Sequence, residues 1–163
     1  RHVHRPMELT SLMRDLVDAG HKVHTTIQRY EARPATAQEA DALKITEGTL
    51  IVHIERTRFA NDEPIAVLTN YIPTDIAPTM QELESGSLYD LMRERGVTLA
   101  SARQVIGARS ATTKEAKLLS EHRGAALLTT QRTTYDPSGR IVEYGAHIYR
   151  ASRYSFEANL FAQ

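Results

Sequence analysis

Apolar residues in the first part of the chain change from helical to strand-like spacing. Leu9, Leu12 and Leu16 recur at helical intervals and predict an amphipathic helix between Met7 and Ala19. From Val23 to Ala32 apolar and polar residues alternate weakly, which predicts a strand that ends before a proline. A helix followed by a strand therefore opens the predicted fold.

The clearest element of the pattern is a hairpin. A strongly apolar segment from Thr49 to Phe59 predicts a strand, and Pro64 to Ile72 predicts its antiparallel partner across a turn at Asn61-Asp62-Glu63. Ahead of this hairpin, Thr36-Ala37-Gln38-Glu39 is a capping-box sequence, which predicts a short helix that ends at Gly48.

The second half of the chain has the same order of elements. Two short helices are expected between Thr74 and Gly96. A strand from Gln104 to Arg109 and a capped helix from Thr112 to Leu119 come next, and strands over Ala125–Tyr135 and Arg140–Tyr149 form a second hairpin.

This similarity between the two halves is an internal repeat. Identical residues recur with the second number minus the first equal to 76: Ala40 and Ala116, Leu43 and Leu119, Gly48 and Gly124, Arg56 and Arg132. Each unit is strand, helix, strand, tight turn and strand, and strands joined by hairpins are antiparallel. We therefore predict an α+β fold, in which two pseudo-repeated units share one antiparallel sheet with helices on one face, as a single domain over residues 1–163.

Composition narrows the functional class. Twenty basic residues balance twenty acidic ones, and the absence of a basic excess makes this segment a poor nucleic-acid binder by itself. There is no cysteine, which suits a reducing cytoplasm, and no apolar run has the length of a membrane span. We expect a soluble, cytoplasmic protein that makes no membrane contact. Because the chain begins at Arg1, we also expect that a further segment precedes it.

The strongest polar signal lies inside the first hairpin. Arg56 and Arg58 flank Thr57 in an apolar strand, and residues two apart on a strand share a face, so their guanidinium groups project side by side. Paired guanidinium groups match carboxylate or phosphate, which predicts an anion-binding site. The alternative is a solvent-exposed face on which acidic neighbours such as Glu55 or Glu143 balance the two cations.

Three other groups of polar residues are candidates for binding or for structural roles. Glu143, in an apolar strand, could accept hydrogen bonds from sugar hydroxyls or pair with an arginine. Ser87 and Tyr89 lie at an expected helix start, where Ser87 either binds an anion or caps the helix. The segment from Tyr149 to Phe156 mixes aromatic rings with cations, either lining a pocket or packing on the sheet edge.

Motifs of common enzymes and metal sites are missing from the sequence. There is no His-x-x-x-His, no Gly-x-Gly-x-x-Gly and no Gly-x-Ser-x-Gly. We therefore expect no catalytic residue, no cofactor and no resident metal.

An ordered series of short motifs resembles the UTRA domain, the effector-binding part of HutC-type GntR transcription regulators. The series runs from Leu9-Thr10-Ser11 through Arg56-x-Arg58, Pro64-Ile65, Ser87-Leu88-Tyr89 and Val142-Glu143 to Tyr149-Arg150-x-x-Arg153-Tyr154-x-Phe156. The resemblance implies a chorismate-lyase-like fold and a homodimer formed through the sheet. It also implies an upstream winged helix-turn-helix domain that binds operator DNA and that this chain lacks.

The resemblance also implies a sensing site. The ligand-binding residues would be Thr10, Ser11, Arg56, Arg58, Ser87, Tyr89, Glu143 and Tyr149. Members of the family that recognise amino-sugar phosphates often carry a Glu where this chain has Leu68, which argues against an amino-sugar phosphate as the ligand. The resemblance implies a small anionic metabolite, a sugar phosphate or a carboxylate, and does not choose among them.

Two alternatives to a sensor remain open. The resembled fold also hosts a lyase that uses arginines and a glutamate, and Arg56 with Glu143 could serve such an enzyme on a small carboxylate. A dimerisation module whose pocket is filled by side chains is the third possibility. We prefer the sensor, then the enzyme, then the module.

Overall fold

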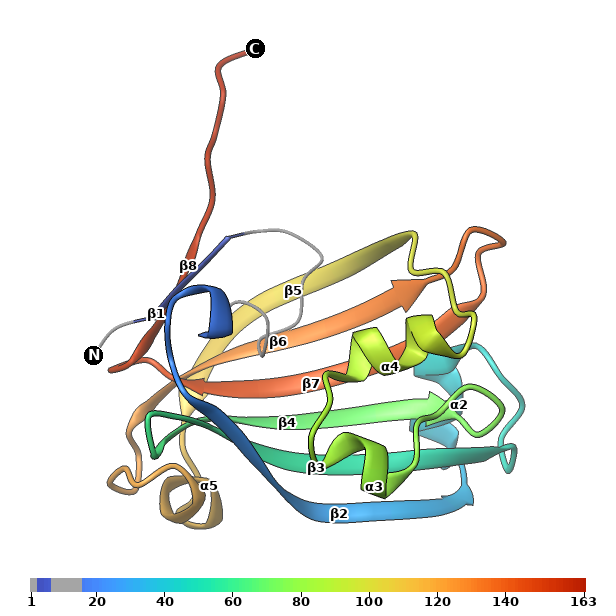
Figure 1. Ribbon diagram of the computed structural model, residues 1–163, viewed down its shortest axis with the longest axis horizontal. Coiled ribbons are helices and arrows are strands. Elements are labelled where there is room, and N and C mark those ends of the chain that lie inside the picture. The colour runs from blue at the N-terminus through green and yellow to red at the C-terminus, as the bar shows by residue number, and fades with distance from the viewer. Residues whose placement is uncertain (1–2, 7–15) are drawn as a thin grey trace.

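A six-stranded antiparallel sheet is the centre of the protein in the computed structural model, which describes residues 3–6 and 16–163 (Figure 1). Its strands lie in the order β2-β3-β4-β7-β6-β5, and every neighbouring pair is antiparallel. Their bounds are Val23–Pro34 (β2), Leu50–Ala60 (β3), Glu63–Pro73 (β4), Ser101–Ser110 (β5), Ala126–Tyr135 (β6) and Ile141–Arg150 (β7). A separate parallel pair joins β1 (Val3–Pro6) to β8 (Tyr154–Glu157).

Besides the helical residues 16–18, the described part of the chain has four short helices that cover the sheet: α2 (Ala37–Leu43), α3 (Met80–Leu83), α4 (Leu88–Glu94) and α5 (Thr113–Leu118). Val52 clusters with Leu83 and Met92, whereas its neighbour Ile51 clusters with Leu43 of α2. Successive strand residues point to opposite faces, so α3–α4 and α2 lie on different sides of the sheet, as Figure 1 shows. We call these the α4 face and the α2 face.

The α+β class and the antiparallel sheet are confirmed, but the helices are not gathered on one face. Helix α5 packs against Val67 and Ile148, which are turned to the α2 face. The physical reason is the repeat: α2 and α5 are equivalent helices of the two units and lie on the same face. Helices α3 and α4, which come from the segment between the units, cover the opposite face.

The two repeated units share more than their identical residues, because their helices also begin in the same way. Thr36 with Glu39 and Thr112 with Glu115 each form a complete capping box. Each capping glutamate also accepts two hydrogen bonds from an arginine of the preceding strand, at 2.7 Å from Arg33 and at 2.6 Å from Arg109. Both units therefore attach their helix to the sheet in the same way.

Most predicted element boundaries agree with the structure to within a few residues. The turn at Asn61 and Asp62 has φ of 51° and 67°, the left-handed geometry that two-residue hairpin loops require. Of the helix predicted between Met7 and Ala19, residues 16–18 are helical and residues 7–15 lie outside the described part. Strand β8 was not predicted.

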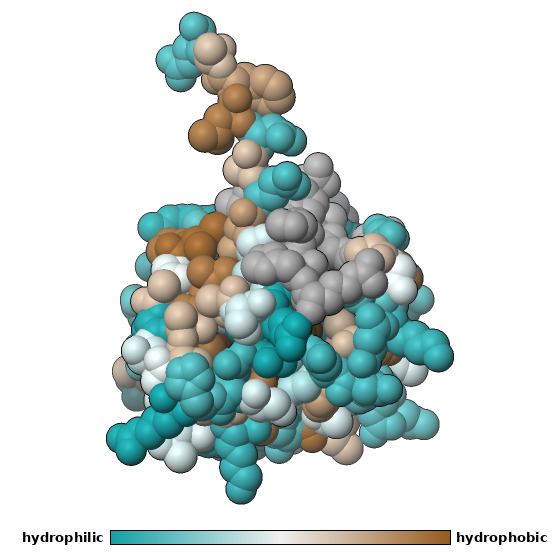
Figure 2. Space-filling model, turned by 90° about the vertical axis from the view of Figure 1, so that its left-hand side faces the viewer, coloured by the Kyte–Doolittle hydropathy of each residue, from teal (hydrophilic) through white to brown (hydrophobic). Residues whose placement is uncertain are grey.

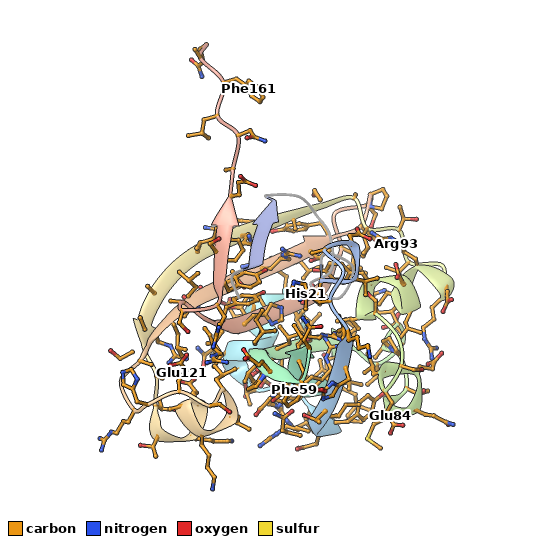
Figure 3. All side chains as sticks on the ribbon, turned by 60° about the vertical axis from the view of Figure 1, so that its left-hand side comes forward. His21, Phe59, Glu84, Arg93, Glu121 and Phe161 are labelled. Atoms are coloured by element: carbon orange, nitrogen blue, oxygen red, sulfur yellow. The ribbon has the colours of Figure 1, made fainter. Side chains whose placement is uncertain are left out.

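The chain ends in an extended segment that leaves the body of the protein. Leu160 and Phe161 are 91% and 89% exposed, and Phe161 lies near the tip of this segment (Figure 3). In Figure 2 the segment projects from the upper side of the molecule and carries several hydrophobic residues.

Two separate apolar clusters lie on the α4 face. One contains Leu16, Leu68 and Tyr149, and the other contains Ile54, Ile72 and the buried residues of α3 and α4. Along β4 the residues that face α4 are Leu68 in the first cluster, then Asn70, then Ile72 in the second cluster. A strip of polar residues therefore separates two apolar regions of one buried face.

Candidate ligand-binding site

The polar strip crosses the four central strands beneath the helices of the α4 face. Its buried members are Arg56, Arg58, Asn70, Thr130, Arg132, Thr134 and Glu143. Buried polar groups destabilise a fold unless hydrogen bonds compensate for lost hydration, so their partners show whether the strip is complete without a ligand.

The two arginines of β3 point into the protein. Arg56 and Arg58 are each 3% exposed, which contradicts the alternative of a solvent-exposed face. Arg56 Nη2 donates to Asn70 Oδ1 at 3.2 Å, and Arg58 Nη1 donates to Thr25 Oγ1. Within the described part of the chain, Arg56 Nε and Nη1 and Arg58 Nε have no hydrogen-bond partner. The pair therefore presents unused donors in a buried setting.

The electrostatic state of the pair follows from burial. Desolvation lowers the pKa of Arg56 to about 10, although the carboxylate of Glu143 opposes that shift. Desolvation and the nearby charge of Arg56 lower the pKa of Arg58 to about 9. Both side chains stay protonated at neutral pH, and both would be stabilised by an incoming anion.

Glu143 of β7 is fully buried and accepts hydrogen bonds from three side chains. Asn70 Nδ2 donates to Oε2 at 2.8 Å, whereas Tyr89 Oη and Thr134 Oγ1 donate to Oε1 at 3.1 Å and 2.9 Å. Burial raises the pKa of Glu143, and the hydrogen bonds from Asn70 and Thr134 oppose this. Within the described residues no salt bridge joins Glu143 to Arg56.

A β-bulge brings Val142 to the α4 face beside Glu143. Thr134 pairs with Glu143, but the next residue of β6, Tyr135, pairs with Ile141, so Val142 is the extra residue of β7. Val142 packs into the apolar cluster beneath α4 while Glu143 reaches the polar strip. The sequence motif Val142-Glu143 is therefore the site of an irregularity that re-aims Val142, whereas Glu143 keeps the face set by strand alternation with Gly145.

Helix α4 contributes two of the predicted residues. Tyr89 is buried, donates to Glu143 and accepts a hydrogen bond from Arg132 Nη1 at 3.2 Å, and burial raises its pKa to about 12. Ser87 occupies the N-cap position, yet its side chain makes no capping bond. Its buried hydroxyl has no hydrogen-bond partner within the described residues. The ordinary capping role considered for Ser87 is therefore absent.

The remaining predicted residues lie at the edge of the strip or cannot be placed. Tyr149 is buried in the first apolar cluster, where its ring stacks on Tyr154 with centroids 4.3 Å apart. Phe156 packs edge-on against both rings, so this part of the carboxyl-terminal motif is an aromatic core. Thr10 and Ser11 lie outside the described residues.

The sequence reasoning missed Asn70 and the surroundings of Gly145. A Cβ on Gly145 would lie 2.6 Å from Glu143 Oε2 and 2.7 Å from His147 Nε2, so both polar groups occupy the space that a side chain would fill. The signal for Asn70 was available in the alternation of β4, because Leu68, Asn70 and Ile72 share a face. The histidines gave no such signal, since their spacing is not that of a motif.

A hollow of about 510 Å³ lies on the α2 face between α5 and the sheet. Its cations are already paired: Arg109 binds Glu115 in a bidentate geometry, and Lys114 Nζ lies 4.0 Å from Glu55. This hollow therefore lacks the unpartnered donors that distinguish the α4 face.

Two other features of the described residues bear on function. No cluster of three or more His, Asp or Glu side chains in residues 3–6 and 16–163 could hold a metal ion. In the same residues, no helix is long and apolar enough to cross a membrane.

Comparison with known proteins places these features in a family. The family model of the UTRA domain matches residues 18–155. The transcriptional repressor NagR of Bacillus subtilis is 32% identical over 150 residues, covering 91% of this chain and 62% of the relative. The probable transcriptional regulator PhnF of Escherichia coli is 33% identical over 127 residues, covering 76% of this chain and 53% of the relative. This chain thus spans less than two thirds of either relative.

Solved structures share the fold. A structure from Streptomyces coelicolor is 48% identical with a TM-score of 0.80, covering 88% of this chain and 96% of the other. The effector domain of PhnF from Mycobacterium smegmatis has a TM-score of 0.91 at 21% identity, covering 98% of this chain and 100% of the other. The named relatives are transcriptional regulators, in agreement with the expectation of a regulatory domain and not an enzyme.

Proposed function

Since this chain belongs to the UTRA domain family, we propose that it is the ligand-sensing and dimerisation part of a longer bacterial transcriptional regulator, and that a small anionic metabolite binds at Arg56 and Arg58. The observation that carries this proposal is the pair of buried guanidinium groups whose donors are not all used by described residues. Ser87 adds a hydroxyl on the same face that has no hydrogen-bond partner in residues 3–6 and 16–163. Tyr89, Glu143 and Tyr149 complete the described part of the site, and Thr10 and Ser11 are proposed to complete it from the preceding segment.

The charges of the strip favour a doubly charged ligand. Arg56 and Arg58 contribute two positive charges that no salt bridge among the described residues neutralises. The other buried arginines have partners of their own: Arg150 pairs with Glu121 at 2.9 Å, and Arg132 donates hydrogen bonds to Gln104 and Tyr89. A phosphate monoester would neutralise the excess more completely than a monocarboxylate, so we place sugar phosphates ahead of carboxylates.

Regulation would follow from differential binding. A ligand changes the affinity of the full protein for operator DNA only if it binds one arrangement of the dimer better than another. The relatives extend beyond the part that this chain matches, which supports an additional DNA-binding segment in the whole protein.

Strand β5 is the edge that best supports a homodimer. Val105 and Ile106 are 45% and 38% exposed at its centre, and none of its residues is buried. The opposite edge strand, β2, carries Arg29, Glu31 and Arg33, whereas the charged residues of β5, Arg103 and Arg109, lie away from its centre. Charged edges discourage pairing with another chain, whereas long apolar edges promote it, so we propose that two copies associate through β5.

Substitution of Arg56 tests the ligand assignment. Arg56→Met keeps an unbranched apolar stem in the buried position and removes the cation. Loss of hydrogen bonds to a charged group costs about 1.5–3 kcal/mol, so we expect the affinity for inorganic phosphate, measured by titration calorimetry, to fall by about tenfold or more. Glucose 6-phosphate and benzoate, titrated in parallel, compare the two ligand classes.

Arg109→Met is the matched control, because Arg109 is an arginine of the opposite face that is already paired with Glu115. It should leave the phosphate affinity unchanged. Equal phosphate affinity in the wild-type and Arg56→Met proteins would show that the site is placed wrongly.

A further inference from the structure

Asn70 lies between the arginine pair and Glu143 in the polar strip. It belongs to β4, whose neighbours are β3 with Arg56 on one side and β7 with Glu143 on the other. Its side chain is 2% exposed and touches both: Oδ1 accepts from Arg56 Nη2 at 3.2 Å, and Nδ2 donates to Glu143 Oε2 at 2.8 Å. The amide therefore bridges a cation and an anion.

The chemistry of the two partners fixes the orientation of this amide. A guanidinium group can only donate hydrogen bonds and an ionised carboxylate can only accept them, so Oδ1 must face Arg56 and Nδ2 must face Glu143. An aspartate could not donate to Glu143, and an apolar residue could satisfy neither partner. A primary amide provides both functions on a short side chain.

The backbone on either side supports this arrangement. Asn70 pairs with Gly145 of β7, and the absence of a side chain at Gly145 leaves room for the carboxylate of Glu143. With the carboxylate held by Asn70, Tyr89 and Thr134, the described residues contain no salt bridge between Glu143 and Arg56. Arg56 Nε and Nη1 remain without a described partner.

We propose that Asn70 is a positioning residue that holds Glu143 away from Arg56, so that the guanidinium group stays available for an anionic ligand. This inference rests on the proposed function of the arginine pair. Without the amide, the two opposite charges would meet directly, and a buried ion pair would occupy the donors that the ligand needs. Asn70 would then control affinity without contacting the ligand.

A rescue experiment separates this role from a structural one. The 163-residue chain is prepared as the wild type, Asn70→Ala, Glu143→Gln and the double variant Asn70→Ala/Glu143→Gln, and each is titrated with inorganic phosphate by calorimetry. Asn70→Ala should lose affinity by about tenfold, because Arg56 turns to Glu143. In the double variant Arg56 has no carboxylate to meet, so phosphate affinity should recover to the level of Glu143→Gln. Asn70→Ser serves in the same design if Asn70→Ala does not fold.

Each result decides the inference. A loss in Asn70→Ala with recovery in the double variant supports it. An unchanged affinity in Asn70→Ala, or a loss that the second substitution does not reverse, overturns it while leaving the arginine site in place. A wild type that binds neither inorganic phosphate nor the other anions would instead refute the proposed function on which the inference rests.

Discussion

Arg56 and Arg58 are buried side by side, and the energetic consequence of this arrangement can be measured. Each cation has lost its hydration, and each also faces the charge of the other. Such groups reduce the stability of the unliganded protein, and apolar replacements of similar volume often increase it. Function and stability should therefore conflict at these two positions.

Arg58→Met tests this conflict. Because the variant removes a desolvated and repelled cation, we expect its free energy of unfolding, measured by urea denaturation without added anions, to rise by about 1 kcal/mol. Saturating phosphate should stabilise the wild type and leave the variant unaffected. Arg33→Met, which breaks a paired arginine, should lower the stability instead. A less stable Arg58→Met protein would indicate that Arg58 is a structural residue.

For individual residues, the sequence predicted which side chains share a face of the sheet but not which face is buried. Alternation in β3 places Arg56 and Arg58 together, yet helices cover both sides of the sheet, so strand periodicity could not decide between solvent and core. The hydrogen bonds of Glu143 were likewise out of reach, because three separate elements supply them. Long-range pairing of this kind has no local signature.

The repeated helix starts are the most informative feature at the level of elements. In each unit a threonine and a glutamate form a capping box, and an arginine of the preceding strand binds the same glutamate. The arginine and the backbone hydrogen bond lower the pKa of Glu39 and of Glu115 to about 2. The ion pairs therefore contribute stability at neutral pH.

Acid titration of Glu39→Gln and Glu115→Gln measures that contribution. A carboxylate with a lowered pKa stabilises the fold above its unfolded pKa of 4.5, and the contribution disappears as the pH falls towards about 2. Partly exposed ion pairs contribute about 0.5–1 kcal/mol, so each variant should be less stable than the wild type at pH 7 by that amount.

The wild-type and variant stabilities should converge as the pH approaches 2, when followed by urea denaturation monitored by circular dichroism. Glu39→Gln should have the larger effect, because the side chains of Arg33 and Glu39 are 20% and 14% exposed against 46% and 21% for Arg109 and Glu115. A constant difference across this pH range would exclude the ion pairs as its source.

Local signals predicted the elements better than their assembly. Turn residues, capping boxes and apolar alternation gave the two hairpins and the four helices of the described chain. The same signals could not distribute the helices between two faces, because the side of the sheet on which a helix packs depends on contacts distant in sequence. Strand β8 was missed because its partner β1 lies at the opposite end of the chain.

We propose that the whole molecule acts as a dimer, because a ligand that favours one arrangement of two copies over another would change their affinity for operator DNA. Ile106→Lys places a charge at the centre of the proposed interface, where burial against a second copy would be costly. Sedimentation equilibrium should show a dimer for the wild type and a shift towards monomer for the variant. Thr26→Lys, on the exposed and already charged edge strand β2, is the matched control and should remain dimeric. A wild type that is monomeric at all concentrations, or an unchanged dimer in Ile106→Lys, would contradict association through β5.

The central claim, that an anion binds at the buried arginine pair, is tested most directly by NMR of the arginine Nε–H groups. Addition of inorganic phosphate to the wild-type chain should shift the resonances of Arg56 and Arg58 and leave that of Arg109 unchanged, because the Nε–H donors of the first two have no partner among the described residues and Arg109 is paired with Glu115. If the Arg56 and Arg58 signals stay unchanged while phosphate or its esters bind elsewhere on the protein, the proposed site is wrong.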